Sequence, residues 1–134
     1  MNAHAWHMLI ETCRVAGDAR TGLEMAERAL VSSGAARLWE AETRRIRGEF
    51  LAALAAPADE VEAELQRALE VARRQGTVSL ELRAATSLTH YLARRGDLLK
   101  THDARERVKE IVSRYPEGSS SADVVDVLSA VDGA

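Results

Sequence analysis

LQRALEVARRQGTVSLELRAATSLTHYL, residues 65–92, predicts two helices that fold back on each other. In its first half, Leu65, Leu69 and Ala72 follow the three- and four-residue spacing of one helical face. The second half keeps this spacing at Leu80, Ala84, Ala85, Leu88 and Leu92. Gly76 separates the halves and can adopt the left-handed conformation that commonly ends a helix. The stretch therefore predicts a helical hairpin.

Similar spacing, interrupted by turn residues, predicts helices along the rest of the chain. We expect them at about residues 2–16, 19–33, 36–54, 58–75, 79–95, 99–114 and 120–132. The first should bury Trp6, Leu9, Ile10 and Cys13, and the third Trp39, Ile46, Phe50 and Ala53. Gly48 lies near Phe50 inside the third helix, where glycine costs about 1 kcal/mol relative to alanine. We therefore expect a neighbouring helix to pack closely against Gly48.

Apolar pairs recur along the chain at intervals close to 40 residues. Ala26 and Leu30 recur at an interval of 39 as Leu65 and Leu69, and again as Ala104 and Val108. Ile46 and Phe50 recur 42 residues later as Leu88 and Leu92, and 37 residues earlier as Leu9 and Cys13. This periodicity predicts three antiparallel hairpins, at about 2–34, 35–76 and 77–116, with a capping helix at about 120–132. The alternative is a helical bundle with accidental spacing.

Composition limits the classes of function. The 134 residues are 46% hydrophobic and 29% charged, which is typical of a single soluble globular domain. A net charge of −3, with both signs interspersed, does not favour nucleic-acid binding. Cys13 is the only cysteine and cannot form an internal disulfide. We found no signal peptide and no apolar run near the ~20 residues that span a membrane. We therefore expect a cytoplasmic protein.

The hairpins resemble tetratricopeptide repeats. GDARTGLEMAERAL, residues 17–30, is similar to the second-helix half of that motif, with Gly22, Ala26 and Ala29 at its small-residue positions. Trp6 and Leu9 stand where the motif carries a bulky pair in its first helix. The spacing here is longer than the family's 34-residue unit. The resemblance implies an all-α fold, a right-handed α-α superhelix whose concave groove is lined by the first helix of each hairpin.

A narrower resemblance covers nearly the whole chain. LWEAETRRIRGEFL (38–51), VEAELQRALEVARRQGTVSLELRAATSL (61–88) and YPEGSSSADVVDVL (115–128) resemble the C-terminal segment of large bacterial signalling proteins. Those proteins join an ATPase module to a tetratricopeptide-like tail, with either a class III adenylate/guanylate cyclase domain or a LuxR-type transcription-factor domain. Glu117, Gly118 and Asp123 match the family's tail pattern, whereas Pro116 and Ser119 depart from it. The resemblance implies a regulatory or interaction segment, not a catalytic one.

The same alignment indicates which residues would face the groove. They are Glu11, Arg14, Glu42, Arg45, Glu49, Arg83, Thr86, His90 and Arg94. The set mixes both signs of charge, and arginine can pair bidentately with carboxylates. We therefore expect a short acidic or mixed-charge peptide as the ligand. The alternative is that a short array forms too shallow a groove and that these are ordinary surface charges.

Other motifs have simpler structural explanations. Residues 17–22 have the glycine spacing of a phosphate loop, but Leu23-Glu24 follow instead of Lys-Ser/Thr, so we interpret them as a turn. His4 and His7 could share a metal site with Glu11, but they have no second ligand pair, and we expect them to face solvent. The doublets 44–45, 73–74 and 94–95 are each Arg-Arg and are interpreted as solvated helix faces. Cys13 is interpreted as a small core residue. We predict no catalytic, cofactor or metal site.

Three functional hypotheses follow. The first is a non-enzymatic interaction or regulatory module that binds a protein or peptide partner, or other domains of a longer parent chain. The second is a homo-oligomerisation module, in which exposed apolar residues near Trp6 or on the last helix pair two copies. The third, which the spacing supports least, is a small enzyme or ligand-binding protein that uses His90 with Glu49. None of the three involves nucleic acid or a membrane.

Overall fold

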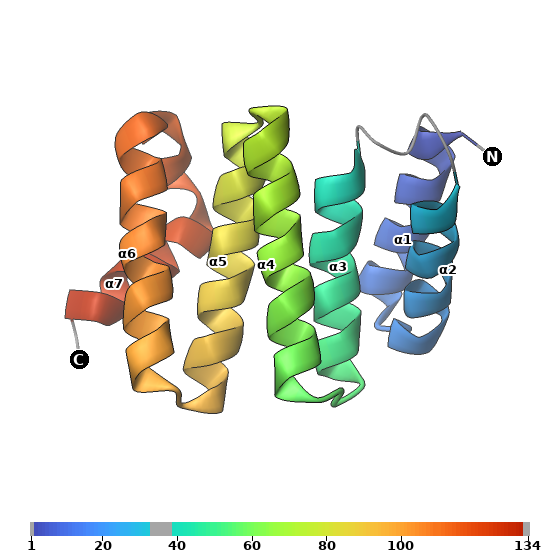
Figure 1. Ribbon diagram of the computed structural model, residues 1–134, viewed down its shortest axis with the longest axis horizontal. Helices are drawn as coiled ribbons and strands as arrows, with labels where there is room; N and C mark the ends of the chain where they lie inside the picture. The colour runs from blue at the N-terminus through green and yellow to red at the C-terminus, as the bar shows by residue number, and fades with distance from the viewer. Residues whose placement is uncertain (1, 33–38, 133–134) are drawn as a thin grey trace.

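The computed structural model describes residues 2–32 and 39–132, and these residues form helices that pack as sequential antiparallel pairs (Figure 1). The described helices are α1 (Ala3–Ala16), α2 (Ala19–Val31), α3 (Glu40–Ala53), α4 (Ala58–Gln75), α5 (Val78–Arg95), α6 (Leu98–Arg114) and α7 (Ala122–Asp132). A 3₁₀ segment, η2 (Pro116–Ser120), precedes α7. No strand occurs within the two described ranges. The all-α prediction is therefore confirmed.

The helices form two layers. Each of α1 to α6 packs against the next along the chain, and α1 also packs on α3, α3 on α5, and α5 on α7. The odd-numbered helices therefore form one continuous layer. Helices α2, α4 and α6 cover its other side and lie towards the viewer in Figure 1. Helices α1 and α7 lie at opposite ends of the row.

The stretch at residues 65–92 folds as expected. Gly76 ends α4 with a left-handed φ of 69°, which an L side chain rarely adopts, and its N–H donates to the Arg73 carbonyl at 3.1 Å. Leu65 and Leu69 are each 2% exposed, and Leu88 and Leu92 are each 3% exposed. The observed bounds of α4 agree with the predicted ones, and α5 begins one residue earlier than predicted. This hairpin forms the centre of the core.

The repeated apolar positions of the even-numbered helices are buried, except Leu30 of α2, which is only half-buried. Ala26 in α2, Leu65 and Leu69 in α4, and Ala104 and Val108 in α6 are all buried on the face towards the odd layer. The same face of each even helix therefore meets the core. This agrees with the expected array of helical hairpins.

Two glycines allow helices to approach closely. A Cβ added at Gly48 would lie 2.7 Å from Leu65 Cδ2, and one added at Gly22 would overlap the ring of Phe50. Both contacts are shorter than carbon atoms tolerate, so a side chain at either position would push two helices apart. The expected close packing at Gly48 is confirmed, with α4 as the neighbour.

A buried carboxylate joins three helices near one end of the row. Glu81 of α5 is 2% exposed and accepts hydrogen bonds from Arg73 of α4 at 3.2 Å and Arg114 of α6 at 2.9 Å. Burial of a charged group is costly unless it is paired and hydrogen-bonded, and here two guanidinium groups provide both.

The structure corrects the expected buried face of α1. Leu9 is 40% exposed, whereas Ile10 is fully buried between α2 and α3. Trp6, Ile10 and Cys13 form the inward stripe, because α1 ends the row and has helices on only one side. Ile10, not Leu9, is therefore the fully buried residue of α1, and it belongs to the same core cluster as Ile46. Met8 and Val15 face outward and are 52% and 78% exposed.

The third predicted helix also needs correction at its ends. Ala53 is exposed, because α3 ends there and the chain turns towards α4, whereas Leu51 is buried in its place. Trp39 is only half-buried and precedes the first residue of α3. The predicted start at residues 36–38 and the predicted stop of α2 at Gly34 lie outside the described residues. Within the described ranges, α2 ends at Val31.

None of the described helices combines the length and the apolar character that crossing a membrane requires.

Candidate functional site

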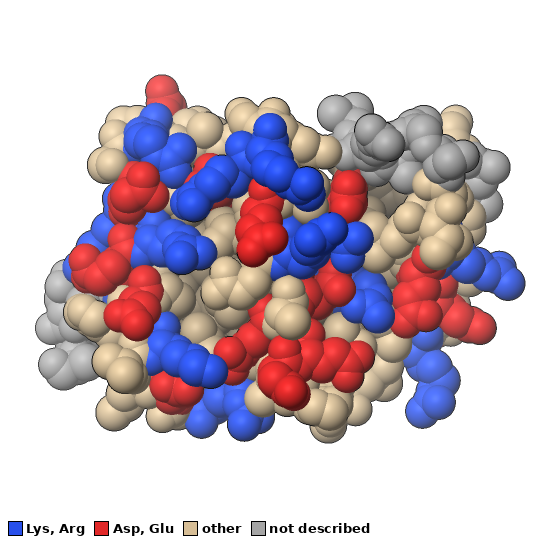
Figure 2. Space-filling view, viewed as in Figure 1, with Lys and Arg blue, Asp and Glu red and all other residues tan. Residues whose placement is uncertain are grey.

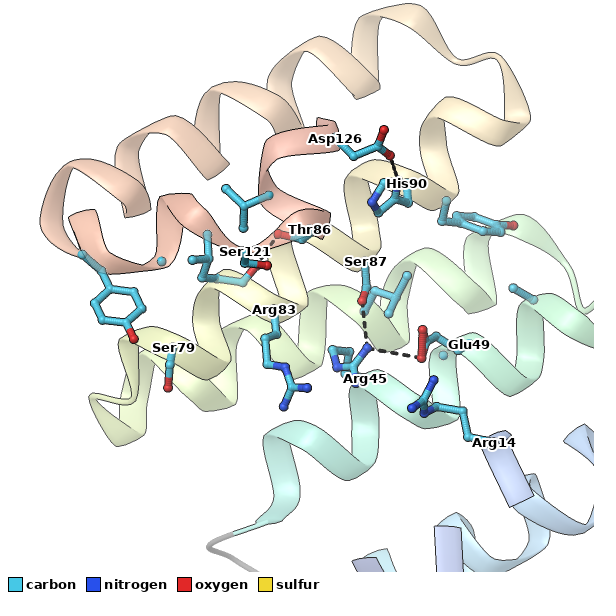
Figure 3. Close-up of a pocket in the computed structure, with 18 of the residues that line it drawn as sticks. Arg14, Arg45, Glu49, Ser79, Arg83, Thr86, Ser87, His90, Ser121 and Asp126 are labelled. Carbon is cyan, nitrogen blue, oxygen red and sulfur yellow. Dashed lines mark hydrogen bonds and ion pairs between the residues drawn. The ribbon is translucent and has the colours of Figure 1, made fainter. Parts of the chain in front are cut away.

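A hollow of about 820 Å³ opens on the side of the row formed by α1, α3 and α5 (Figure 3). Arg14 of α1 lies at one end, α3 and α5 provide the floor and one wall, and η2 with α7 closes the other end. Residues of α1, α3 and α5 thus line one shared space. We call this space the groove.

One face of α5 runs along the groove. Ser79, Arg83, Thr86, His90 and Arg94 all line it, at intervals of four, three, four and four residues. Residues at these intervals share a helical face. Arg83 and Arg94 are exposed, and the guanidinium of Arg94 has no hydrogen-bond or ion-pair partner in the described part of the chain. The wall therefore presents cations separated by polar, uncharged side chains.

A buried ion pair lies beneath this wall. Glu42 of α3 is 2% exposed and accepts hydrogen bonds from Arg45 Nη2 at 2.6 Å and Arg45 Nε at 3.1 Å. Arg83 Nη1 of α5 lies 3.1 Å from the same carboxylate. The bidentate contact with Arg45 and the second cation offset the cost of burying the charge. Glu42 therefore fixes two arginines relative to each other across α3 and α5.

The pKa values of this pair follow from its surroundings. Burial alone would raise the pKa of the Glu42 carboxyl, but the hydrogen bond and charge of Arg45, with the charges of Arg83 and His7, hold it below its ordinary value. Burial alone would lower the pKa of Arg45, and the hydrogen bond and charge of Glu42 raise it above the ordinary value instead. Both groups are therefore ionised at neutral pH.

Arg45 also reaches towards the open groove. Its Nη1 donates to Glu49 at 3.2 Å and to the Ser87 hydroxyl of α5 at 3.1 Å (Figure 3). Arg45 is only 8% exposed, so most of its surface is covered by these partners. It positions Glu49 and joins α3 to α5, and little of it remains free for a ligand.

The C-terminal wall comes from η2 and α7. Val124 and Val127 anchor α7 in the core, each 3% exposed. Gly118 lets η2 pack directly on Leu82 and Tyr115, where a Cβ would collide with both side chains. Asp126 Oδ2 lies 3.7 Å from His90 Nδ1 across the groove. The groove is therefore closed at this end by the part of the chain that follows α6.

The structure brings together most of the nine predicted groove residues. Seven of them line the groove, namely Arg14, Arg45, Glu49, Arg83, Thr86, His90 and Arg94. Glu42 lies beneath the surface instead. Glu11 pairs with Arg14 at 2.9 Å and is not part of the lining. Their proximity is thus established, and a role in binding stays a prediction.

Several lining residues were missed by the sequence analysis. Ser79 and Ser87 lie four residues on either side of Arg83, so helical spacing could have identified them. Glu117, Ser121 and Asp126 could not be found in this way, because their position depends on how η2 and α7 turn back over α5. Only the fold shows that the C-terminal segment forms a wall.

The structure modifies two other expectations. His7 does not face solvent but stacks on Trp39, with ring centroids 4.3 Å apart and planes inclined at 16°. The doublet at 44–45 is not a solvated face, because Arg45 is buried and Arg44 is bound by Glu40 and Glu64, each at 3.0 Å. The turn interpretation of residues 17–22 is confirmed only at its start, since Gly17 ends α1 and Asp18 caps α2, whereas residues 19–22 form the first turn of α2. No group of three or more His, Cys, Asp or Glu residues in the described ranges is arranged to hold a metal ion.

The face formed by α2, α4 and α6 differs from the groove. Figure 2 shows lysine and arginine interspersed with aspartate and glutamate across it. Lys100 pairs with Glu62 at 3.0 Å above a smaller hollow of about 300 Å³, whose floor includes Leu88 and Leu92. Because both signs of charge are interspersed on this face, it presents no patch of one sign, and we regard the groove as the stronger candidate site.

Comparison of the chain with models of known protein families, with curated proteins and with solved structures found no match.

Proposed function

We propose that this chain is a non-enzymatic protein-interaction or regulatory module that binds a segment of a partner protein along the groove. The observation that carries the proposal is the polar wall of α5, where the exposed Arg83 and Arg94 face a hollow large enough for a peptide. The tetratricopeptide-like right-handed superhelix implied by the sequence belongs to the same proposal. In such a superhelix the groove would run continuously along α1, α3 and α5.

The arrangement of His90 and Glu49 favours binding over catalysis. These residues both line the groove, but His90 lies towards Asp126 and Glu49 accepts a hydrogen bond from Arg45. A general base needs to reach the proton of a nucleophile or substrate within hydrogen-bond distance. The contact of His90 with Asp126 instead spans α5 and α7, and the contact of Glu49 with Arg45 lies within α3, which suits a rigid binding surface.

Charge indicates the chemistry of the partner. Arg94 carries a guanidinium with no partner in the described residues, and Arg83 keeps a side chain that is 59% exposed while it contacts Glu42. Arginine binds carboxylates bidentately, so Arg83 and Arg94 can both donate hydrogen bonds to acidic side chains of a ligand. An acidic or mixed-charge peptide therefore fits this wall best.

The resemblance to bacterial signalling proteins supports a regulatory context. In that context the partner is a domain of the same parent chain, in either a cyclase-linked or a LuxR-type protein. An immunoblot of the source cells against this domain tests the idea. A band far above 14.6 kDa supports an attached regulatory domain, and a band at 14.6 kDa supports a free-standing adaptor.

The interaction itself is tested by affinity purification from the source cells with a quantitative mass-spectrometric readout. We expect Arg94→Glu to lose at least one protein that the unchanged chain retains. Arg67→Glu is the matched control, because Arg67 is an exposed residue of α4 outside the groove lining. An identical set of retained proteins for all three chains would count against the groove. The Arg45→Glu change is unsuitable here, because it would disrupt the buried pair with Glu42.

A second candidate function is homo-oligomerisation through α1. Met8, Leu9 and Val15 form an exposed apolar stripe on the outer side of this terminal helix, where no helix of the described ranges covers them. Light scattering during size-exclusion chromatography measures the mass across a concentration series. If α1 pairs two copies, Val15→Glu abolishes the dimer, whereas Val31→Glu, at an equally exposed valine of α2, leaves it intact. A monomer at all concentrations would exclude this function.

A further inference from the structure

We propose that His90 makes the groove sensitive to pH: when protonated, it pairs with Asp126 of α7 and offsets a negative charge that opposes acidic partners. Acidic segments then bind more tightly in mildly acidic conditions. The inference rests on the proposed binding function and adds its regulation. It follows from one contact between α5 and α7 and from the charges that line the groove.

The contact between His90 and Asp126, which we call the clasp, depends on the charge of the imidazole. His90 Nδ1 lies 3.7 Å from Asp126 Oδ2 (Figure 3). This distance is longer than the ~3.2 Å limit of an ordinary hydrogen bond, but it is within the ~4 Å of an ion pair. A neutral imidazole therefore leaves Asp126 unpaired, whereas a protonated one attracts it. Histidine is the side chain whose charge ordinarily changes between about pH 5 and 8.

The groove has no excess of positive charge while His90 is neutral. Its lining holds four arginines and three carboxylates, and a fourth carboxylate lies buried beneath them. The arginines are Arg14, Arg45, Arg83 and Arg94, and the carboxylates are Glu49, Glu117, Asp126 and the buried Glu42. Arginine and carboxylate side chains ordinarily keep their charges from about pH 5.5 to 8. His90 is the only histidine among the described lining residues, so its proton supplies the positive excess.

The charged groups that share the hollow with His90 come from five elements. They are Asp126 of α7, Glu117 of η2, Arg83 and Arg94 of α5, Arg45 and Glu49 of α3, and Arg14 of α1. Arg45 and Glu49 pair with each other at 3.2 Å. Arg94, four residues along α5, repels a charged imidazole, and Asp126 attracts it. Within the described residues, Asp126 is the carboxylate that lies at ion-pair distance from His90.

The clasp changes what an acidic ligand meets. The side chain of Asp126 is 75% exposed, so its charge repels acidic groups in the groove when His90 is neutral. Protonated His90 offsets that charge. The guanidinium of Arg94, about one helical turn away on the same wall, is then opposed by one carboxylate fewer when it binds an acidic side chain. An exposed charge pair typically changes an affinity about two- to fivefold.

Hydrogen exchange of the full chain tests the clasp without a ligand. After correction for intrinsic exchange rates, the amides of residues 124–128 in α7 should be about two- to fivefold better protected at pH 5.5 than at pH 8. His90→Gln and Asp126→Asn should each remove this increase. His102→Gln should keep it, because His102 is an exposed histidine of α6 outside the groove lining. Protection that does not rise in the unchanged chain, or that rises equally in His90→Gln and Asp126→Asn, would overturn the inference.

Peptide binding tests the effect of the clasp on the groove. The probes are histidine-free peptides selected on phage against the full chain at pH 5.5, and only those that Arg94→Glu fails to retain are used. By fluorescence anisotropy, they should bind the unchanged chain about two- to fivefold more tightly at pH 5.5 than at pH 8. His90→Gln should lose this difference and His102→Gln should keep it. Asp126→Asn should bind more tightly than the unchanged chain at pH 8, by a similar factor.

The outcomes separate this inference from the binding function. Equal affinities of the unchanged chain at the two pH values would overturn the inference and leave peptide binding intact. A selection that yields no peptide dependent on Arg94 would overturn the binding function, and hydrogen exchange would still decide whether the clasp exists.

Discussion

Arg44 and Arg45 are neighbours in the sequence but contact different helices on different sides of α3. Arg44 binds Glu64 of α4 at 3.0 Å, so it joins two helices of the same hairpin. Arg45 binds the buried Glu42 and the Ser87 hydroxyl of α5, so it joins one hairpin to the next. Successive residues of a helix point about 100° apart, which is why one doublet reaches two different interfaces.

The comparison shows that burial determines what an ion pair does for the fold. The side chain of Arg44 is 21% exposed, and water can replace its partners at modest cost. Arg45 and Glu42 are buried between α3 and α5, so removing either one would leave the other a buried charge with only one ionic partner, Arg83 for Glu42 or Glu49 for Arg45. The floor of the groove is consequently one of the positions where the fold is least tolerant of change.

The largest expected difference between the two arginines concerns stability. Arg45→Met leaves the buried Glu42 with Arg83 alone and should lower the free energy of unfolding by about 3–5 kcal/mol. Arg44→Met should lower the free energy of unfolding by about 1 kcal/mol or less, because Glu64 still pairs with Arg47, whose Nη1 lies 2.6 Å from Glu64 Oε2. Urea unfolding followed by circular dichroism measures both. Equal losses would show that the two sides of α3 do not differ in this way.

A smaller effect is expected where α3 packs on α4 through Gly48. Gly48→Ala gains about 1 kcal/mol of helix propensity but forces Leu65 to move, and overpacking costs about 1–3 kcal/mol. We expect a net loss of about 1 kcal/mol in the same unfolding assay. In a Leu65→Ala background the change should become stabilising, because the colliding side chain is gone. A loss that persists in that background would place the conflict elsewhere.

The pH dependence of the unfolding free energy tests the contribution of the buried Glu42–Arg45 pair. The pKa of Glu42 is lowered from its ordinary value of 4.5, so its ionised form stabilises the folded state above that pH. This contribution is lost as pH falls through the lowered folded pKa. Glu42→Gln should therefore be less stable than the unchanged chain at pH 7, and the difference should shrink as pH falls below about 4.5. Unfolding free energies measured across this range provide the check, and parallel curves would contradict the assignment.

The smallest effect is expected at the exposed end of the wall. Arg94→Glu should change the unfolding free energy by less than about 0.5 kcal/mol, because its guanidinium has no partner in the described structure. Arg67→Glu on α4 should behave alike. Thermal melts of the two variants test this, and they also establish that any loss of binding by Arg94→Glu is not a loss of folding. A destabilisation approaching that of Arg45→Met would instead give Arg94 a structural role.

The sequence was most informative where apolar spacing and turn residues agree. The predicted bounds of α4 match the structure because Pro57 and Gly76 flank a regular apolar stripe. Leu9 and Ala53 were wrongly assigned to the core, since spacing alone does not show which side of a terminal helix is covered or where a helix ends. The close contact at Gly48 was predictable because a glycine inside a helix is costly without such a reason.

The candidate site was predictable in part, for a related reason. Helical spacing and the resemblance together bring Arg83, Thr86, His90 and Arg94 onto one face. Spacing does not reveal that Glu42 is buried, because a charged residue in the sequence is usually solvated. The positions of Glu117 and Asp126 depend on the path of η2 and α7, which involves contacts distant in the sequence. The partner of the groove stays a prediction.

The Glu81 carboxylate has a mechanical consequence. Helices α1 and α7 lie at opposite ends of the row, so a force applied to the ends of the chain loads the helix contacts in series. Such an array would extend one hairpin at a time if each contact failed independently. Arg73 and Arg114 hold the same oxygen of Glu81 from α4 and α6. We therefore expect these three helices to resist extension together.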